Sequence, residues 1–222
     1  PWSGKRPRID GDLSDWPVVT PIRLDASDAV REQAVWTPEE EKTTVLFRSF
    51  WNESRLYLSF EVRKKSFYPE DRYGEASIWK GDSVQIAFDT ICNAARAQAG
   101  YQDDDFEYSF ALFKKQPLVI CAYASASTYD SLPKAVGVNR QVEFALRRTP
   151  DGVVYEIALP PVSISPFKLT AGAMTRFNFL VNLNNGKQRI GWLELQPGIG
   201  RIPKRPGLFP DFVLLPEKTA TR

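Results

Sequence analysis

Hydrophobic and polar residues alternate with a period of two along several short segments of the chain. In the clearest segment, residues 83–89, the side chains of Val84, Ile86 and Phe88 are separated by smaller or more polar residues, so they share one face of an extended strand. Residues 106–112 repeat the alternation with larger aromatic side chains. This pattern predicts strands with one face buried in a core.

The same criterion, together with turn-forming residues between the segments, predicts most of the chain as strand. Further strands are expected at residues 21–24, 43–51, 56–63, 118–124, 142–147, 153–159, 176–183, 189–195 and 212–215. Hairpin turns are expected at residues 52–55, 149–152 and 184–187. About ten strands and hardly any helical periodicity predict an all-β fold, an antiparallel β-sandwich of jelly-roll type.

Three segments lack a clear strand pattern. Residues 25–42 are polar apart from Trp36 and are expected to form a surface loop. Residues 64–76 form a long polar loop that carries Phe67, Tyr68 and Tyr73, which are either lids on the core or platforms for a ligand. Residues 91–101 are small and polar and could hold one helical turn.

Composition fits one folded domain. The chain has 222 residues, of which 43% are hydrophobic and 25% charged, so we expect a single domain over residues 1–222. It starts without Met, and we expect a piece excised from a larger protein. A net charge of +2 gives no field that would attract nucleic acid or an anionic membrane, and no apolar run is long enough to span a bilayer.

The chain contains no histidine, which removes the commonest general base and metal ligand. Serine triads, zinc hydrolase motifs and histidine-ligated haem are therefore excluded, and no haem is expected; Met174 is interpreted as a packing residue. The two cysteines, Cys92 and Cys121, fit no metal-binding spacing. A buried thiol at Cys121 and a bridge between the two cysteines both stay open.

Five short motifs, in this order along the chain, resemble those of the family 9 carbohydrate-binding modules, which have a DOMON-like β-sandwich. They are Ile9-Asp10-Gly11-x-x-x-Asp15-Trp16, Leu56-Tyr57-Leu58, Trp79-x-x-Asp82-Ser83-Val84-x-Ile86-x-x-Asp89, Tyr155-Glu156-x-Ala158-Leu159 and Phe177-Asn178-x-x-Val181-Asn182. The resemblance extends from about Arg8 to Leu215. It implies a sandwich with a shallow sugar-binding groove on the outward face of one sheet, and structural calcium in some members.

The resemblance assigns Trp79 as a stacking platform, because the axial C–H groups of a pyranose pack well on an aromatic face. A partly buried lid on the core is the alternative for this residue. Two features depart from the family pattern. The loop at residues 196–205 lacks the second Trp of the family, and Gln85 and Ser109 stand where the family has an acid and an arginine.

The remaining candidates for ligand binding share the outward face with Trp79. They are Gln85, Glu107, Ser109, Asn178 and Asn182. Such a face either accepts sugar hydroxyls or is merely solvated. The basic residues Arg201, Lys204 and Arg205 would suit an anionic glycan.

Adjacent acids supply the candidate metal ligands. Asp103, Asp104 and Asp105 offer the oxygen ligands that Ca²⁺ prefers, and a solvated acidic loop is the alternative.

These residues favour a non-catalytic carbohydrate-binding domain of a secreted or cell-surface protein. Its expected partners are a polysaccharide or oligosaccharide and the neighbouring domains of a parent protein. One alternative is a structural or docking domain that has lost the sugar site. A second is an enzyme that pairs Glu107 with Asp105 as a glycosidase pairs two carboxylates.

Overall fold

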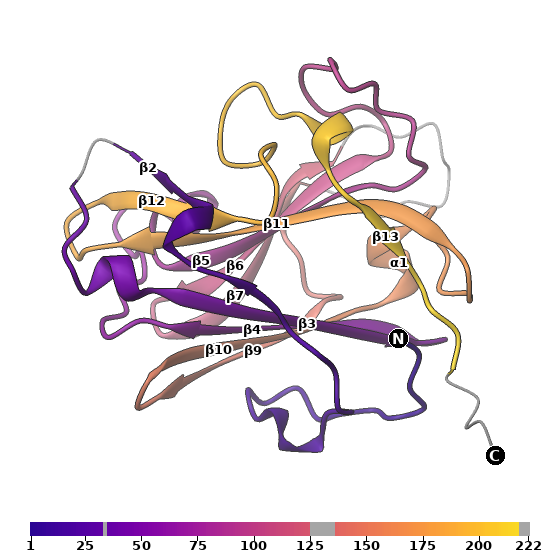
Figure 1. The fold of residues 1–222 in the computed structure, drawn as a ribbon, viewed down its shortest axis with the longest axis horizontal. Helices are drawn as coiled ribbons and strands as arrows, with labels where there is room; N and C mark the ends of the chain where they lie inside the picture. Colours follow the sequence, from indigo (N-terminus) through magenta and orange to yellow (C-terminus); the bar gives the residue numbers. More distant parts are fainter. Residues whose placement is uncertain (33–34, 125–135, 218–222) are drawn as a thin grey trace.

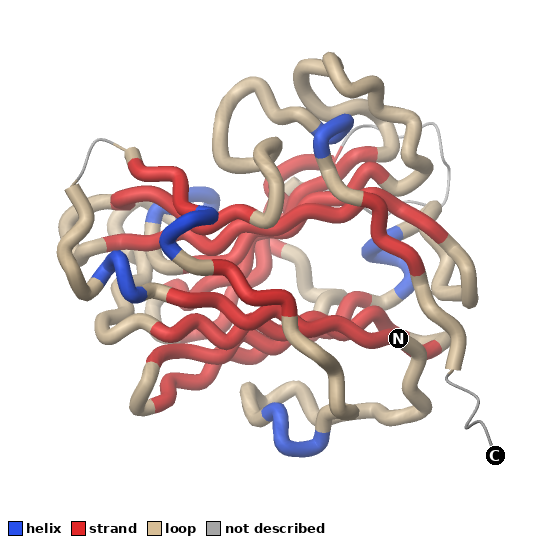
Figure 2. The backbone as a smooth tube through the Cα atoms, viewed as in Figure 1, coloured by secondary structure: helices blue, strands red, loops and turns tan. Residues whose placement is uncertain are grey.

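Two antiparallel sheets pack face to face in the computed structural model, which describes residues 1–32, 35–124 and 136–217 (Figures 1 and 2). The first sheet has the order β1 (Ile22–Leu24), β3 (Thr44–Asn52), β4 (Arg55–Arg63), β10 (Gly152–Leu159) and β9 (Glu143–Thr149). The second has the order β2 (Ala29–Arg31), β12 (Arg189–Glu194), β11 (Met174–Asn184), β5 (Ser83–Asp89), β6 (Asp105–Phe113), β7 (Gln116–Ala124) and β8 (Gly137–Val138). Strand β13 (Asp211–Val213) also pairs with β11.

The core lies between the two sheets and is built from the residues whose alternation predicted the strands. Val84, Ile86 and Phe88 are fully buried there, beside Phe177 and Phe179 of β11. The burial of this apolar area is the main favourable contribution to folding. The prediction of an antiparallel β-sandwich is confirmed.

The described residues form thirteen strands, where the sequence predicts about ten. The difference includes β2 and β8, whose two or three residues are too short to show a period of two. Strand β2 lies within residues 25–42, so the prediction of a surface loop there is wrong in part. Trp36 is also buried, with its Nε1 donating to the carbonyl oxygen of Ile190 at 3.0 Å.

In the described residues, helical structure is limited to short segments. They are α1 (Pro161–Ile164) and the 3-10 helices η1 (Leu13–Asp15), η2 (Ala26–Asp28), η3 (Glu40–Lys42), η4 (Glu75–Lys80) and η5 (Pro206–Leu208). Residues 91–101, where the sequence allows one helical turn, form turns and bends instead. Across the described ranges, no helix has the length and apolar character needed to cross a membrane. Cys92 and Cys121 do not form a disulfide bridge.

Segments outside the sheets cover both outer faces of the sandwich. Residues 9–19 pack on the first sheet, where Trp16 contacts Phe50 and Tyr57. On the second sheet, η4 and the loop between β12 and β13 lie over the outward-facing residues. The polar outward face of this sheet is therefore largely buried, so the alternative of a merely solvated face is wrong.

Candidate functional site: a cavity beside Trp79

Helix η4 fixes the position of Trp79 on the outer face of the second sheet. Ile78, fully buried, packs on Ala111 and Ile120 of the sheet beneath it. Gly81 ends the helix where a Cβ atom would lie 2.4 Å from the backbone nitrogen of Glu70, so a side chain cannot be placed there without moving the backbone. Trp79 is held half-buried as a result.

The loop between β12 and β13 forms the opposite side of the site. Its Ile199 and Phe209 pack on Trp192 and Leu180. The buried carboxylate of Glu194 accepts hydrogen bonds from Trp192 Nε1 at 2.8 Å, from the backbone N–H of Ile199 at 2.6 Å and from that of Gly200 at 3.2 Å. One acid therefore anchors this loop to the sheet.

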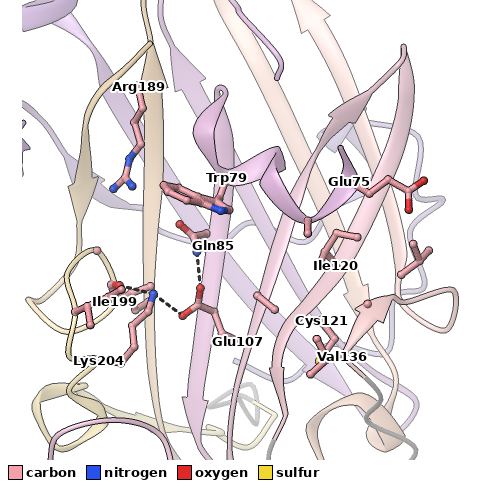
Figure 3. A pocket seen from close by; sticks show the side chains of 16 residues that line it. Glu75, Trp79, Gln85, Glu107, Ile120, Cys121, Val136, Arg189, Ile199 and Lys204 are labelled. Carbon is pink, nitrogen blue, oxygen red and sulfur yellow. Dashed lines mark hydrogen bonds and ion pairs between the residues drawn. The ribbon is translucent and has the colours of Figure 1, made fainter. Parts of the chain in front are cut away.

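A cavity of about 460 Å³ lies between η4 and this loop (Figure 3). The polar part of its lining consists of Glu75, Trp79, Gln85, Glu107, Arg189 and Lys204. The apolar part includes Ile120 of β7, Val138 of β8, Val136 just before β8, and Ile199 and Ile202 of the β12–β13 loop. The cavity thus combines an aromatic ring and hydrogen-bonding groups with an apolar wall.

Glu107 is the centre of a hydrogen-bond network at the polar end of the cavity. Its Oε2 accepts from the Tyr101 hydroxyl at 2.6 Å and lies 2.9 Å from Lys204 Nζ, while Oε1 accepts from Gln85 Nε2. Gln85 Oε1 in turn accepts from Asn182 Nδ2 at 2.9 Å. Burial, followed by the Glu107 charge, raises the pKa of Tyr101 well above its usual value, so the phenol stays a donor.

Arg189 supplies a guanidinium that the sequence reasoning missed. Its Cζ lies 5.1 Å from the ring centroid of Trp79 and 4.3 Å from that of Trp192, at distances typical of cation–π contacts. Its Nε and Nη2 atoms are buried without a hydrogen-bond partner, and Nε lies 3.8 Å from Glu32 Oε2. Burial lowers the pKa of Arg189 from its ordinary value.

The predicted ligand-binding residues divide into two groups. Trp79, Gln85 and Glu107 do line one cavity, whereas Ser109, Asn178 and Asn182 are absent from its lining among the described residues. Asn178 Nδ2 donates to the carbonyl oxygen of Gln196 at 2.7 Å, so it secures the β12–β13 loop. Of the three basic residues in that loop, only Lys204 reaches the cavity, and Glu107 neutralises it.

A second group of carboxylates lies beside the site and differs from the predicted set. Oxygens of Asp89, Asp104 and Asp105 lie within 4.8 Å of one another, and all three residues are buried. Asp103 is exposed on the turn before β6, because the strand begins at Asp105, and it lies outside this group. The predicted ligands Asp103, Asp104 and Asp105 therefore share Asp104 and Asp105 with this group, and Asp89 is its third member.

Asp105 lies in a buried, strongly acidic environment. Its Oδ1 atom is buried and accepts no hydrogen bond. Burial first, and then the neighbouring carboxylates of Asp104 and Asp89, raise its pKa to about 7. Arg176 Nη1, 3.1 Å from Asp89 Oδ2, supplies one balancing charge. Asp105 and Glu107 belong to separate networks, and Asp105 is not among the residues that line the cavity.

Comparison with known proteins gives results for the family and for the fold. The model of the family described as "Carbohydrate family 9 binding domain-like" matches residues 9–199. No curated protein matches the chain.

Two solved structures of a family 9 carbohydrate-binding module from Caldicellulosiruptor kristjanssonii are similar over the whole chain. The one in complex with cellotriose has 21% identity and a TM-score of 0.66 and is covered to 95% of its length. The one in complex with glucose has 20% identity and a TM-score of 0.65 and is covered to 99%. At these identities the likeness concerns the fold.

Proposed function

Because the chain belongs to the carbohydrate family 9 binding domain-like family, we propose that it binds carbohydrate, without catalysis, in the cavity beside Trp79. This membership agrees with the resemblance of the five motifs. The observation that carries the proposal is the convergence of Trp79, Gln85 and Glu107 on one cavity. Its volume lies within the range of small-ligand sites, roughly 300–1,000 Å³.

The chemistry of the lining suits a pyranose ring. The half-buried ring of Trp79 offers a flat apolar surface to axial C–H groups. Gln85 and Glu107 provide amide and carboxylate groups to hydroxyls, and Lys204 provides an ammonium donor. Their mutual hydrogen bonds hold these groups in place before a ligand arrives, which reduces the entropy cost of binding.

The likeness to the module solved with cellotriose and glucose supports neutral glucose units as the first ligands to test. A docking domain without a sugar site is less well supported, because the cavity beside Trp79 is retained although the loop lacks a second Trp. A glycosidase is also less well supported, because Asp105 and Glu107 do not share the cavity.

Calorimetric titration of a cello-oligosaccharide series and a glycan array test the proposal. We expect saturable binding by the wild type, a loss of roughly tenfold or more in Trp79→Ala, and partial retention in Trp79→Phe. Trp2→Ala is a matched control, because Trp2 pairs with Trp51 of the first sheet, donates its Nε1–H to Glu53 and is absent from the described lining of the cavity. No glycan bound by the wild type, or equal binding by Trp79→Ala, would contradict the proposal.

We also propose that calcium occupies the group formed by Asp89, Asp104 and Asp105. The three carboxylates fit such an ion, because they are close together and one buried oxygen lacks a partner. Bound calcium would neutralise the excess charge and link β5 to β6. We expect calcium to raise the Tm of the wild type and of Asp103→Asn, but not that of Asp105→Asn. An equal rise in all three proteins would contradict the assignment.

Family membership further supports a place outside the cell, as a domain of a protein that acts on glycans. The sequence of the complete open reading frame tests this part directly. A secretion signal and a neighbouring glycan-active domain are expected, and an intracellular parent protein would contradict it.

A further inference from the structure

Trp79 also forms part of a second hollow, which has a different chemical character from the first. This hollow has a volume of about 310 Å³, and its lining includes Arg72, Tyr73, Trp79, Lys80, Lys187 and Arg189. Trp79 and Arg189 therefore line both spaces. A ligand that packs against Trp79 in the first cavity could continue past the ring into the second.

Basic side chains outnumber acidic ones in this second hollow. Four of its lining residues are basic and two are acidic, which leaves a net positive charge. Glu70 is engaged by Arg72, whose Nη2 lies 2.7 Å from its Oε2. Within the described part of the chain, neither Lys80 nor Lys187 forms an ion pair with a carboxylate. Two ammonium groups are thus available to an anionic ligand.

Arg189 adds hydrogen-bonding capacity at the junction of the two spaces. Its Nε and Nη2 atoms are buried without hydrogen-bond partners. Nε lies 3.8 Å from Oε2 of Glu32, which is beyond hydrogen-bond distance. Buried donors without partners are costly, so a small shift of the guanidinium toward a ligand carboxylate would be favourable. The planar guanidinium matches a carboxylate in shape.

Tyr73 provides an exposed aromatic surface beside these cations. It is 61% exposed, and Lys80 Nζ lies 4.5 Å from its ring centroid. Arg72 Cζ lies 5.3 Å from the same centroid. Because both cations lie over the ring, Tyr73 holds them beside the hollow, where they can meet an acidic group.

The second hollow is held in shape by the hairpin turn between β11 and β12. Arg72 Nη2 donates to the carbonyl oxygen of Lys187 at 3.2 Å, which joins this turn to residues 64–74. At Gly186, where φ is +88°, a Cβ atom would lie 3.0 Å from the Tyr68 ring. The close packing of these two loops fixes the spacing of Arg72 and Lys187 before any ligand binds.

We propose that this second hollow is a subsite for the carboxylate of a uronic acid residue, so that the preferred ligand is an acidic glycan extending past Trp79. The inference rests on the proposed function, since it assigns the ligand class of the same binding region. Lys204 of the first cavity does not provide this selectivity because Glu107 neutralises it. Lys80, Lys187 and Arg189 provide it instead.

The test compares an oligogalacturonide or a glucuronic acid-substituted xylo-oligosaccharide with the same oligosaccharide after reduction of its carboxyl groups. Titration uses the wild type, the double variant Lys80→Gln/Lys187→Gln and the control Lys168→Gln, an exposed lysine remote from both spaces. We expect the acidic ligand to bind the wild type more tightly than its reduced form, by roughly tenfold. The double variant should lose that preference, and Lys168→Gln should keep it.

Each other outcome overturns a defined part of the inference. If the wild type binds the acidic and reduced ligands with equal affinity and still binds cello-oligosaccharides, the proposal of a uronate subsite is wrong, and the proposed function is unaffected. Binding of dextran sulfate as tight as that of the uronate, with the same loss in the double variant, replaces uronate recognition by general attraction of polyanions. If the wild type binds no glycan, both the uronate subsite and the proposed function are contradicted.

Discussion

The indole nitrogen of Trp16 lies 2.7 Å from Oε1 of Glu156, a residue 140 positions later in the chain. The other oxygen of the same carboxylate accepts hydrogen bonds from the backbone N–H groups of Asp10, at 2.9 Å, and Gly11, at 2.7 Å. Glu156 therefore fastens the first segment of the chain to the outer face of the first sheet. The first and the fourth of the five motifs that resemble the family, which contain Trp16 and Glu156, therefore contact each other directly.

Replacing Glu156 with Ala should destabilise the fold. Three donors would lose their acceptor, and those that stay buried would be unsatisfied, so we expect the free energy of unfolding to fall by about 2–4 kcal/mol. Urea denaturation measures this change. The control Glu143→Ala, which removes an exposed ion pair with Arg55, should cost less than about 1 kcal/mol. Equal losses in the two variants would show that the carboxylate is not the anchor.

The sandwich itself could be predicted from the sequence because its core strands alternate with a period of two. Val84, Ile86 and Phe88 illustrate this, since all three are fully buried as expected. The same periodicity says which face a residue shares but not what covers that face. Gln85 and Asn178 do face outward from the core, yet η4 and the β12–β13 loop bury them.

The candidate site could be predicted only in part for the same reason. Trp79, Gln85 and Glu107 were found because they lie on or beside regular strands that pair with each other. Arg189 was missed because its approach to Trp79 depends on how η4 packs beside the start of β12, and no local pattern signals that. Asp89 joins Asp105 because β5 and β6 pair in register, which the strand pattern alone does not specify.

A methyl group at Gly200 should disturb the wall of the cavity. A Cβ atom there would lie 2.1 Å from Cε2 of Trp192, well inside van der Waals contact. We expect Gly200→Ala to lower the free energy of unfolding by about 1–3 kcal/mol and to weaken sugar binding, because the displaced loop carries Ile199 and Lys204. Chemical denaturation followed by tryptophan fluorescence reports the first effect, and calorimetry the second.

Gly4→Ala is the matched control for this change, because the nearest atom to its added Cβ would be 3.2 Å away, at the tip of the Trp2 ring. It should leave sugar affinity unchanged. Unaltered stability and affinity in Gly200→Ala would mean that the loop is loosely held, in spite of its hydrogen bonds to Glu194.

The ion pair of Glu70 and Arg72 should make stability depend on pH in a defined direction. Arg72, through its hydrogen bonds, holds the pKa of Glu70 below its usual range although burial opposes this. A depressed pKa means that the pair stabilises the fold above the unfolded-state pKa of a glutamate, about 4.3, and that this stability is lost as the pH falls through the folded-state pKa.

Glu70→Gln should therefore lower the free energy of unfolding at about pH 7, by about 1–2 kcal/mol, and lower it by less at about pH 3. Guanidinium or urea denaturation at both pH values measures the difference. Glu75→Gln is the control, because Glu75 is exposed and has no ion-pair partner among the described residues. An equal loss at both pH values would assign the role of Glu70 to packing.

Glu107→Gln distinguishes a residue that contacts the ligand from one that only shapes the cavity. Glu107 accepts hydrogen bonds from Gln85 and Tyr101 and forms an ion pair with Lys204. A glutamine has an NH₂ group in place of one carboxylate oxygen, so this NH₂ group would face at least one of those three hydrogen-bond donors. We expect a loss of stability of about 1–3 kcal/mol together with weaker sugar binding. If calorimetry shows unchanged affinity in a protein with lowered stability, Glu107 is a support beneath Gln85, and Gln85 and Trp79 alone make the contacts with the sugar.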